Sequence, residues 1–255
     1  MLPASGNSGG AGSLVQLAAA LQVGVPCPFS VDVVAALKHW HARCGMIVTV
    51  IAADGEMWRG RLAELNEAAG ILIPFQRSLH PFESSLALTV YQALPEKERF
   101  ELILEKLTEL GVTRIVPFVS QHSSTLAARD AKQPKSHRWP EVLRRAAVQC
   151  RRAMIPELSP CLDLSAVFAD APDTALRLML YEGEGASSLK ELLSGQECRQ
   201  VALLIGPEGG FALEEVVNAR LHGFLPVSLG PRILRTETAA ISAATVIQYA
   251  LGDLS

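Results

Sequence analysis

Two glycine-containing segments near the C-terminal end of the chain have the residue types that bind a ligand through the main chain. They are residues 204–211 (LIGPEGGF) and residues 229–239 (LGPRILRTETA). Each follows an apolar, strand-like run and precedes a helical pattern, so each is expected to form a turn at the end of a strand. Because glycine has no side chain, a ligand can approach the N–H and C=O groups of such turns closely. The pattern favours a nucleotide-like ligand.

The other common catalytic patterns are missing from the sequence. Neither glycine segment has the G-x-G-x-x-G spacing, and the first lacks the Lys-Ser/Thr ending of a phosphate-binding loop. Among the six histidines there is no H-E-x-x-H pattern, and no G-x-S-x-G turn is present. We therefore expect neither a metal site nor a Ser-His-Asp hydrolase.

One stretch of the chain is strongly basic, although the formal net charge is −3. A nucleic-acid partner would have to bind such a local patch, since the whole protein is not basic. If a helix starts at Pro140, a spacing of seven residues places four of these arginines on one face, which suits a phosphate backbone. The alternative is a solvated face on which Glu141 pairs with Arg145. The basic residues of the stretch are Lys132, Lys135, Arg138, Arg144, Arg145, Arg151 and Arg152.

His122 lies on the loop after a predicted strand and is followed by Ser123, Ser124 and Thr125. It is either a substrate contact or part of an exposed polar loop.

The cysteines and the apolar runs indicate the compartment. The five cysteines show no C-x-x-C spacing, and their odd number is not typical of a disulfide framework. No run is long enough to span a membrane, and the start lacks the pattern of a signal peptide. We expect reduced thiols and a cytoplasmic protein.

The chain divides into three predicted parts. Residues 1–13 are rich in glycine and serine and are expected to be a disordered tail. Residues 14–75 contain short β-rich runs at 46–51, 57–62 and 70–75, with a hairpin signal at 53–56, and predict a small β-barrel. Residues 76–255 form the third part, which opens with a polar boundary stretch at 76–85.

The third part alternates between strand and helix patterns. Strands are expected at 86–94, 114–119, 176–181, 201–205 and 225–229, and helices at 96–110 and 213–221. This alternation predicts an α/β domain with a mostly parallel sheet. The last helix, 237–251, is apolar nearly all round and predicts burial on two sides, either between the sheet and a domain or at a subunit interface, and we expect a homodimer.

Several blocks together resemble the bacterial 16S rRNA uridine-N3 methyltransferases of the SPOUT superfamily. The likeness covers about residues 86–254, and residues 14–75 stand where that family carries a PUA-like, RNA-binding domain. The blocks are residues 100–112 (FELILEKLTELGV), Arg138-Trp139, Ala146-Ala147 with Gln149 and Arg152, residues 205–211 and residues 229–239.

The resemblance implies a trefoil-knotted α/β domain that holds S-adenosylmethionine, and a homodimer. It also implies that three loops form the cofactor pocket, with the backbone amides of Ile205, Leu229 and Leu234 contacting adenine and ribose. The implied cofactor-binding residues are Tyr181, Glu182, Ile205, Gly206, Pro207, Gly209, Gly210, Leu229, Gly230, Ile233, Leu234 and Thr238.

Methyl transfer from a sulfonium needs mainly in-line positioning. The N3 atom of uridine is protonated at neutral pH, so an arginine that stabilises the anion on O2 or O4 would help, and Arg232 and Arg235 are the candidates. Each could instead bind phosphate or pair with Glu208 or Glu237. Glu208 could accept the proton or fix its loop.

The implied partner is 16S rRNA or the 30S subunit. The expected RNA contacts are Arg138, Arg144, Arg145, Arg151, Arg152 and His122. Two alternatives remain open at this point: a SPOUT-like module that binds RNA without transferring methyl, and a SPOUT enzyme that acts on tRNA or on a ribose hydroxyl.

Overall fold

A computed structural model describes residues 9–95, 99–125, 127–128, 130 and 136–254. The described chain forms two compact units, one of residues 84–142 and 158–254 and the other of residues 9–83 and 143–157. The break at residues 83 and 84 falls inside the predicted boundary. Residues 143–157, however, pack with the N-terminal unit, whereas the sequence placed them in one continuous C-terminal part. The backbone explains this, since the Gly10 N–H donates to the Ile155 carbonyl and the Ile155 N–H donates to Ser13 Oγ.

The predicted tail is partly structured. Residues 1–8 lie outside the described residues, but Gly10–Ser13 form a short 3-10 helix, and Ser13 is fully buried. The Trp40 indole N–H donates to the Ser13 carbonyl at 2.6 Å. Residues 10–13 therefore have a defined structure, which the small-residue composition did not predict.

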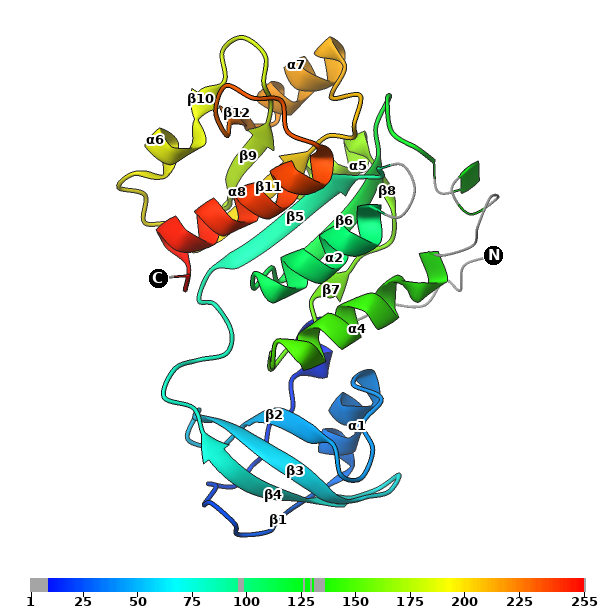
Figure 1. The fold of residues 1–255 in the computed structure, drawn as a ribbon, viewed down its shortest axis with the longest axis vertical. Coiled ribbons are helices and arrows are strands. Elements are labelled where there is room, and N and C mark those ends of the chain that lie inside the picture. Colours follow the sequence, from blue (N-terminus) through cyan, green and yellow to red (C-terminus); the bar gives the residue numbers. More distant parts are fainter. Residues whose placement is uncertain (1–8, 96–98, 126, 129, 131–135, 255) are drawn as a thin grey trace. The chain divides into compact units, whose positions relative to one another are not determined.

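The smaller unit contains a four-stranded antiparallel sheet in the order β1-β4-β3-β2 (Figure 1). The strands are β1 (Cys27–Phe29), β2 (Ile47–Ile51), β3 (Met57–Leu65) and β4 (Gly70–Arg77). The predicted hairpin joins β2 to β3, and Gly55 takes a left-handed φ of 82° in its turn. Strand β1 and helix α1 (Val31–His39) were not predicted.

The larger unit is the predicted α/β domain with a parallel sheet. Its strand order is β10-β12-β9-β11-β5-β6-β7, and β8 pairs with β6. The strands are β5 (Ala87–Ala93), β6 (Arg114–Val119), β7 (Glu157–Leu158), β8 (Leu162–Asp163), β9 (Leu176–Leu180), β10 (Ser187–Ser188), β11 (Gln200–Ile205) and β12 (Leu225–Ser228). The pairings of β5, β9, β11 and β12 are all parallel, so their carboxyl ends lie at one edge.

The helices that lie wholly in the larger unit include α2 (Arg99–Glu109), α5 (Leu164–Asp170), α6 (Leu189–Leu193), α7 (Leu213–Leu221) and α8 (Thr236–Leu251). Helix α4 (Trp139–Gln149) begins in the larger unit, and its residues from Leu143 on belong to the smaller one. Gly111 ends α2 with a φ of 77°, as predicted. Helix α8 packs against α2, α6 and β11 and appears beside α2 in Figure 1.

Helix α8 is buried on one side through Ala240, Ala243, Ala244 and Ile247, whereas Tyr249 is 75% exposed. The segment before α8 leaves β12, which lies beyond β9, and returns to β11. It therefore crosses the carboxyl ends of these strands, which is the path that the predicted knot requires. The knot itself stays a prediction.

None of the helices in the described part of the chain is both long and apolar enough to span a bilayer.

Candidate active site

The two glycine segments meet at the carboxyl edge of the parallel sheet. The first follows β11 and the second follows β12, and both strands pair with β9, from which Tyr181 and Glu182 continue. Between them lies a cavity of about 410 Å³, which falls within the usual size of small-molecule pockets. A smaller cavity of about 40 Å³ adjoins it and shares five lining residues. The structure thus brings the three predicted loops together.

Most of the predicted cofactor-binding residues line these two cavities. The larger one is lined by Tyr181, Glu182, Ile205, Gly206, Pro207, Gly209, Gly210, Ile233 and Leu234, and the smaller one by Tyr181, Glu182, Leu229, Gly230 and Leu234. Thr238 is the exception, because its side chain is exposed on α8 outside both linings. Thr236, two residues earlier, lines the larger cavity instead.

Thr236 ties the first glycine loop to the centre of the sheet. Its hydroxyl donates to the Gly206 carbonyl at 2.7 Å and accepts from Gln92 Nε2 at 3.0 Å. Gln92 is fully buried on β5, and its Nε2 also donates to the Ala93 carbonyl. The start of α8, the loop after β11 and β5 are therefore joined by one short polar chain. Sequence reasoning missed both Thr236 and Gln92, although a glutamine within an apolar strand was a visible signal.

The glycines of the first loop are required for different reasons. A Cβ on Gly206 would lie 3.1 Å from the Phe211 ring, and a Cβ on Gly209 would lie 2.9 Å from His122 Cβ. Gly210 has a φ of 67°, and a Cβ there would meet open space. Space thus selects the first two glycines, whereas backbone conformation selects Gly210.

The charged groups at the larger cavity centre on Arg99, which sequence reasoning also missed. Arg99 NH1 lies 3.0 Å from Glu208 Oε1, and Arg99 Nε lies 3.9 Å from Glu237 Oε1. Arg235 lines the larger cavity and Arg232 the smaller one. Among the described residues neither of these two arginines forms an ion pair, so the acids considered as their partners are held by Arg99 instead.

The loop that carries His122 packs against the glycine turn. His122 Nδ1 lies 3.2 Å from the Gly210 carbonyl oxygen. Glu215 of α7 accepts from the Gln121 N–H at 2.8 Å and from the Ala212 N–H at 2.9 Å. This loop therefore supports the turn at residues 209–212, and an RNA contact of His122 stays a prediction.

The predicted face of four arginines is wrong. Helix α4 ends at Gln149, and Arg151 has a left-handed φ of 66°, so the helical spacing does not continue to Arg151 and Arg152. Arg152 is 4% exposed and donates to Glu83 Oε2 at 2.6 Å. Arg144 donates to the Trp40 carbonyl, whereas Arg138 and Arg145 are exposed. Lys132 and Lys135 lie outside the described residues.

The described residues contain no group of three His, Cys, Asp or Glu side chains that could hold a metal ion. None of the five cysteines, all of which lie within the described residues, forms a disulfide bond.

Comparisons with known proteins agree with this geometry. The model of an RNA methyltransferase domain matches residues 82–248. A ribosomal RNA small subunit methyltransferase E from Buchnera aphidicola is 30% identical over 194 residues, which are 76% of this chain and 78% of the relative. One from Mycobacterium bovis is 36% identical over 162 residues, which are 61% of this chain and 60% of the relative.

Solved structures extend the likeness to both units. A ribosomal RNA small subunit methyltransferase E from Neisseria gonorrhoeae, bound to S-adenosyl methionine, has a TM-score of 0.68 and 27% identity and covers 94% of this chain and 98% of its own. A putative methyltransferase from Legionella pneumophila, in complex with the same cofactor, has a TM-score of 0.66, 31% identity and the same coverage. This chain therefore belongs to the ribosomal RNA small subunit methyltransferase E family and has the SPOUT-type α/β fold.

Proposed function

We propose that this protein transfers the methyl group of S-adenosylmethionine to N3 of a uridine in the 16S RNA of the small ribosomal subunit. The observation that supports this most directly is the cavity of about 410 Å³ between the two glycine bends at the carboxyl edge of the sheet. Solved relatives that carry this fold were crystallised with S-adenosylmethionine. Because the proposed substrate is ribosomal RNA, we propose that the enzyme acts in the cytoplasm.

The residues present fit S-adenosylmethionine. The cavity combines apolar side chains of Ile205, Ile233 and Leu234 with main-chain groups of a glycine turn, which suits an adenosine with a polar amino-acid tail. A Cβ on Gly210 would project into open space rather than into protein, so this glycine leaves room beside the turn. The bound cofactor supplies an activated methyl group, and the protein has to position the acceptor nitrogen in line with it.

Arg235 and Arg232 are proposed to stabilise the uracil anion. Both are exposed at the cavities, and neither is neutralised by a carboxylate within the described residues. A guanidinium that donates to O2 or O4 would favour the form of uracil with a lone pair on N3. Glu208, which Arg99 holds at 3.0 Å, is assigned to fixing the loop rather than to accepting the proton.

Arg138, Arg145 and His122 remain the proposed RNA contacts at the larger unit and on α4. A homodimer is also part of the proposal. Its support is the exposed side of α8, where Tyr249 is 75% exposed on a helix rich in alanine and isoleucine. Sedimentation analysis should show a particle of about twice 27.4 kDa.

The test is methyl transfer to unmodified small-subunit ribosomal RNA, followed by nucleoside analysis. We expect N3-methyluridine as the only new nucleoside. Arg235→Ala should lower kcat, and Arg235→Lys should restore part of it. Arg220→Ala is the matched control, because Arg220 is an exposed arginine on α7 outside both cavities. Binding of cofactor without transfer would favour a binding module, and a methylated ribose or tRNA would favour another target.

A further inference from the structure

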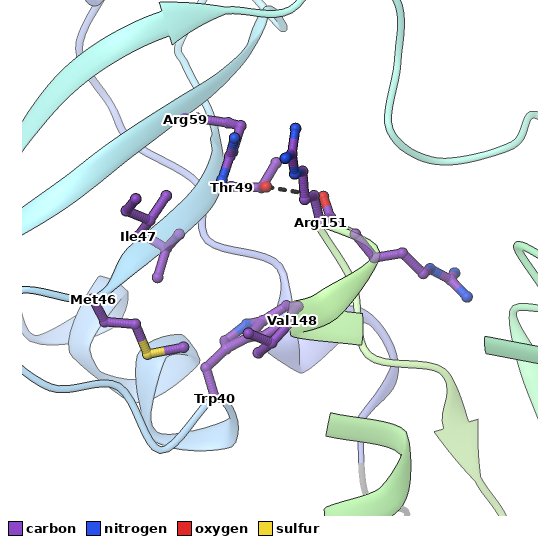
Figure 2. A pocket seen from close by; sticks show the side chains of 9 residues that line it. Trp40, Met46, Ile47, Thr49, Arg59, Val148 and Arg151 are labelled. Carbon is purple, nitrogen blue, oxygen red and sulfur yellow. Dashed lines mark hydrogen bonds between the residues drawn. The ribbon is translucent and has the colours of Figure 1, made fainter. Parts of the chain in front are cut away.

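The smaller unit has a shallow cleft whose charges are not balanced within it. Figure 2 shows the cleft, which is lined by residues of strands β2 and β3 and of the turn after α4. Its volume is about 20 Å³, and its floor and rim include Met46, Ile47, Thr49, Arg59 and Arg151. No carboxylate is among its lining residues.

The backbone at Arg151 is strained. Its φ of 66° lies in the left-handed region, and among the described residues only His41 shares this feature without being glycine. A side chain with a Cβ costs about 1 kcal/mol or more in that region, whereas glycine does not pay this penalty. The conformation is fixed from both sides, because Thr49 Oγ1 donates to the Arg151 carbonyl at 3.0 Å and the Arg151 N–H donates to the Val148 carbonyl at 3.3 Å. An arginine where glycine would be more stable indicates that its side chain has a use.

Arg59 and Arg151 act on each other electrostatically. Burial, and then the positive charge of Arg151, lower the pKa of the Arg59 guanidinium from its ordinary value. Arg59 also lies over the Phe75 ring, with 5.7 Å between the guanidinium carbon and the ring centre. The described residues provide neither arginine with an acid partner. By contrast, Arg77 of β4 pairs with Glu56 at 2.7 Å.

We propose that Arg59 and Arg151 together bind the phosphodiester backbone of the RNA substrate. The inference rests on the proposed function, because it takes RNA as the substrate. Two like charges in one cleft repel each other until an anion lies between them, and guanidinium groups match phosphate oxygens with paired donors. Met46 and Ile47, which are half-buried at the same cleft, give the adjoining ribose an apolar surface. Arg151, whose backbone is strained, thus supplies one of the two guanidinium groups of the site.

The test uses the full-length protein and compares three variants: Arg151→Gly, Arg59→Ala and Arg77→Ala. The probe is unmodified small-subunit ribosomal RNA, and its affinity is measured at several salt concentrations. Arg151→Gly and Arg59→Ala should each weaken binding by about three- to tenfold at 0.1 M salt and reduce the slope of log affinity against log salt by about one. Arg77→Ala removes the same formal charge from a neighbouring strand, but that charge is already paired, so its effect should be smaller than twofold.

Arg151→Gly gives a second, independent readout. Because it relieves strain, its urea midpoint should equal or exceed that of the unchanged protein while its RNA affinity falls. In methyl transfer, KM for RNA should rise with kcat nearly constant, since the cleft lies in the unit that does not contain the cofactor cavity.

Unchanged RNA affinity and salt slope in both variants would overturn the proposal. The outcome is separable from that of the proposed function. RNA binding that depends on both arginines, in a protein without methyl transfer, would refute the transferase while supporting the cleft. Normal methyl transfer with an unaffected KM for RNA in both variants would support the transferase and refute the RNA-binding cleft.

Discussion

Replacing Thr236 with valine is expected to damage both stability and cofactor binding, because one hydroxyl joins the cofactor loop to the sheet. Valine has nearly the same shape, so the change removes the hydroxyl and little else. Gln92 Nε2 then loses an acceptor at 3.0 Å, and the Gly206 carbonyl loses a donor at 2.7 Å. Gln92 is fully buried and its Oε1 already has no partner among the described residues, so water cannot easily replace the lost bond.

The magnitude follows from these two groups. Leaving a buried polar group unsatisfied costs about 1–3 kcal/mol. The Gln92 amide keeps its bond to Ala93, and the Gly206 carbonyl is only partly buried, so we take the lower half of that range for each group. The free energy of unfolding should fall by about 2–4 kcal/mol in total. Without its anchor the Gly206 loop should also bind S-adenosylmethionine about tenfold more weakly, which corresponds to roughly 1.4 kcal/mol.

Urea denaturation followed by circular dichroism measures the first effect, and calorimetric titration measures the second. The matched control is Thr245→Val on the same helix, where an exposed hydroxyl donates only to the Ile241 carbonyl. That variant should lose less than about 0.5 kcal/mol. Thr236→Ser keeps the hydroxyl and should bind cofactor nearly normally. If Thr236→Val and Thr245→Val have the same unfolding free energy, the proposed anchor does not exist.

Three further changes test other contacts. Gly209→Ala should weaken cofactor binding more than it lowers stability, because its Cβ would lie 2.9 Å from His122 Cβ and push the supporting loop away. Calorimetry on this variant with and without His122→Gly, which removes that Cβ, should show partial rescue. Asp170→Asn should destabilise the protein by about 1–3 kcal/mol at neutral pH, since two donors of Arg114 lie 2.6 and 3.0 Å from the carboxylate. Burial raises the pKa of Asp170, but the hydrogen bonds that it accepts outweigh this and lower it overall, so its stabilisation is present above its ordinary pKa and is lost as the pH falls through the folded value. Urea midpoints that differ equally at neutral and at strongly acidic pH would contradict that assignment. Glu83→Gln should cost about 3 kcal/mol or more in thermal unfolding, because it removes the carboxylate charge that lies 2.6 Å from the 4% exposed Arg152; a loss below 1 kcal/mol would show that the pair contributes little.

The parallel sheet and the cofactor loops could be predicted because their signals are local. Strands such as β5 and β11 are largely apolar runs, and Gly111 and Gly223 mark helix ends with the left-handed φ that glycine favours. Glycine turns after two strands that share a neighbour have to meet at one edge, so the pocket followed once the sheet was parallel.

The remaining features depend on contacts that are distant in sequence. The buried ion pair of Arg152 with Glu83 spans 69 positions, so a basic stretch looked like a solvated or RNA-binding face. Residues 143–157 join the smaller unit through Ser13, which lies 142 positions from Ile155. Helical spacing also could not show that α4 stops at Gln149, because Arg151 occupies a backbone conformation in which glycine is expected.

The binding of S-adenosylmethionine to the unchanged protein and to Gly210→Val tests the central claim most directly. A valine side chain at Gly210 would extend into the open space beside the turn, at a φ of 67° that also reshapes the loop. Calorimetric titration should show one cofactor per chain for the unchanged protein and no measurable binding for the variant, with circular dichroism showing that both are folded. Equal affinity in the two proteins, or no binding to the unchanged one, would contradict the assignment of this cavity.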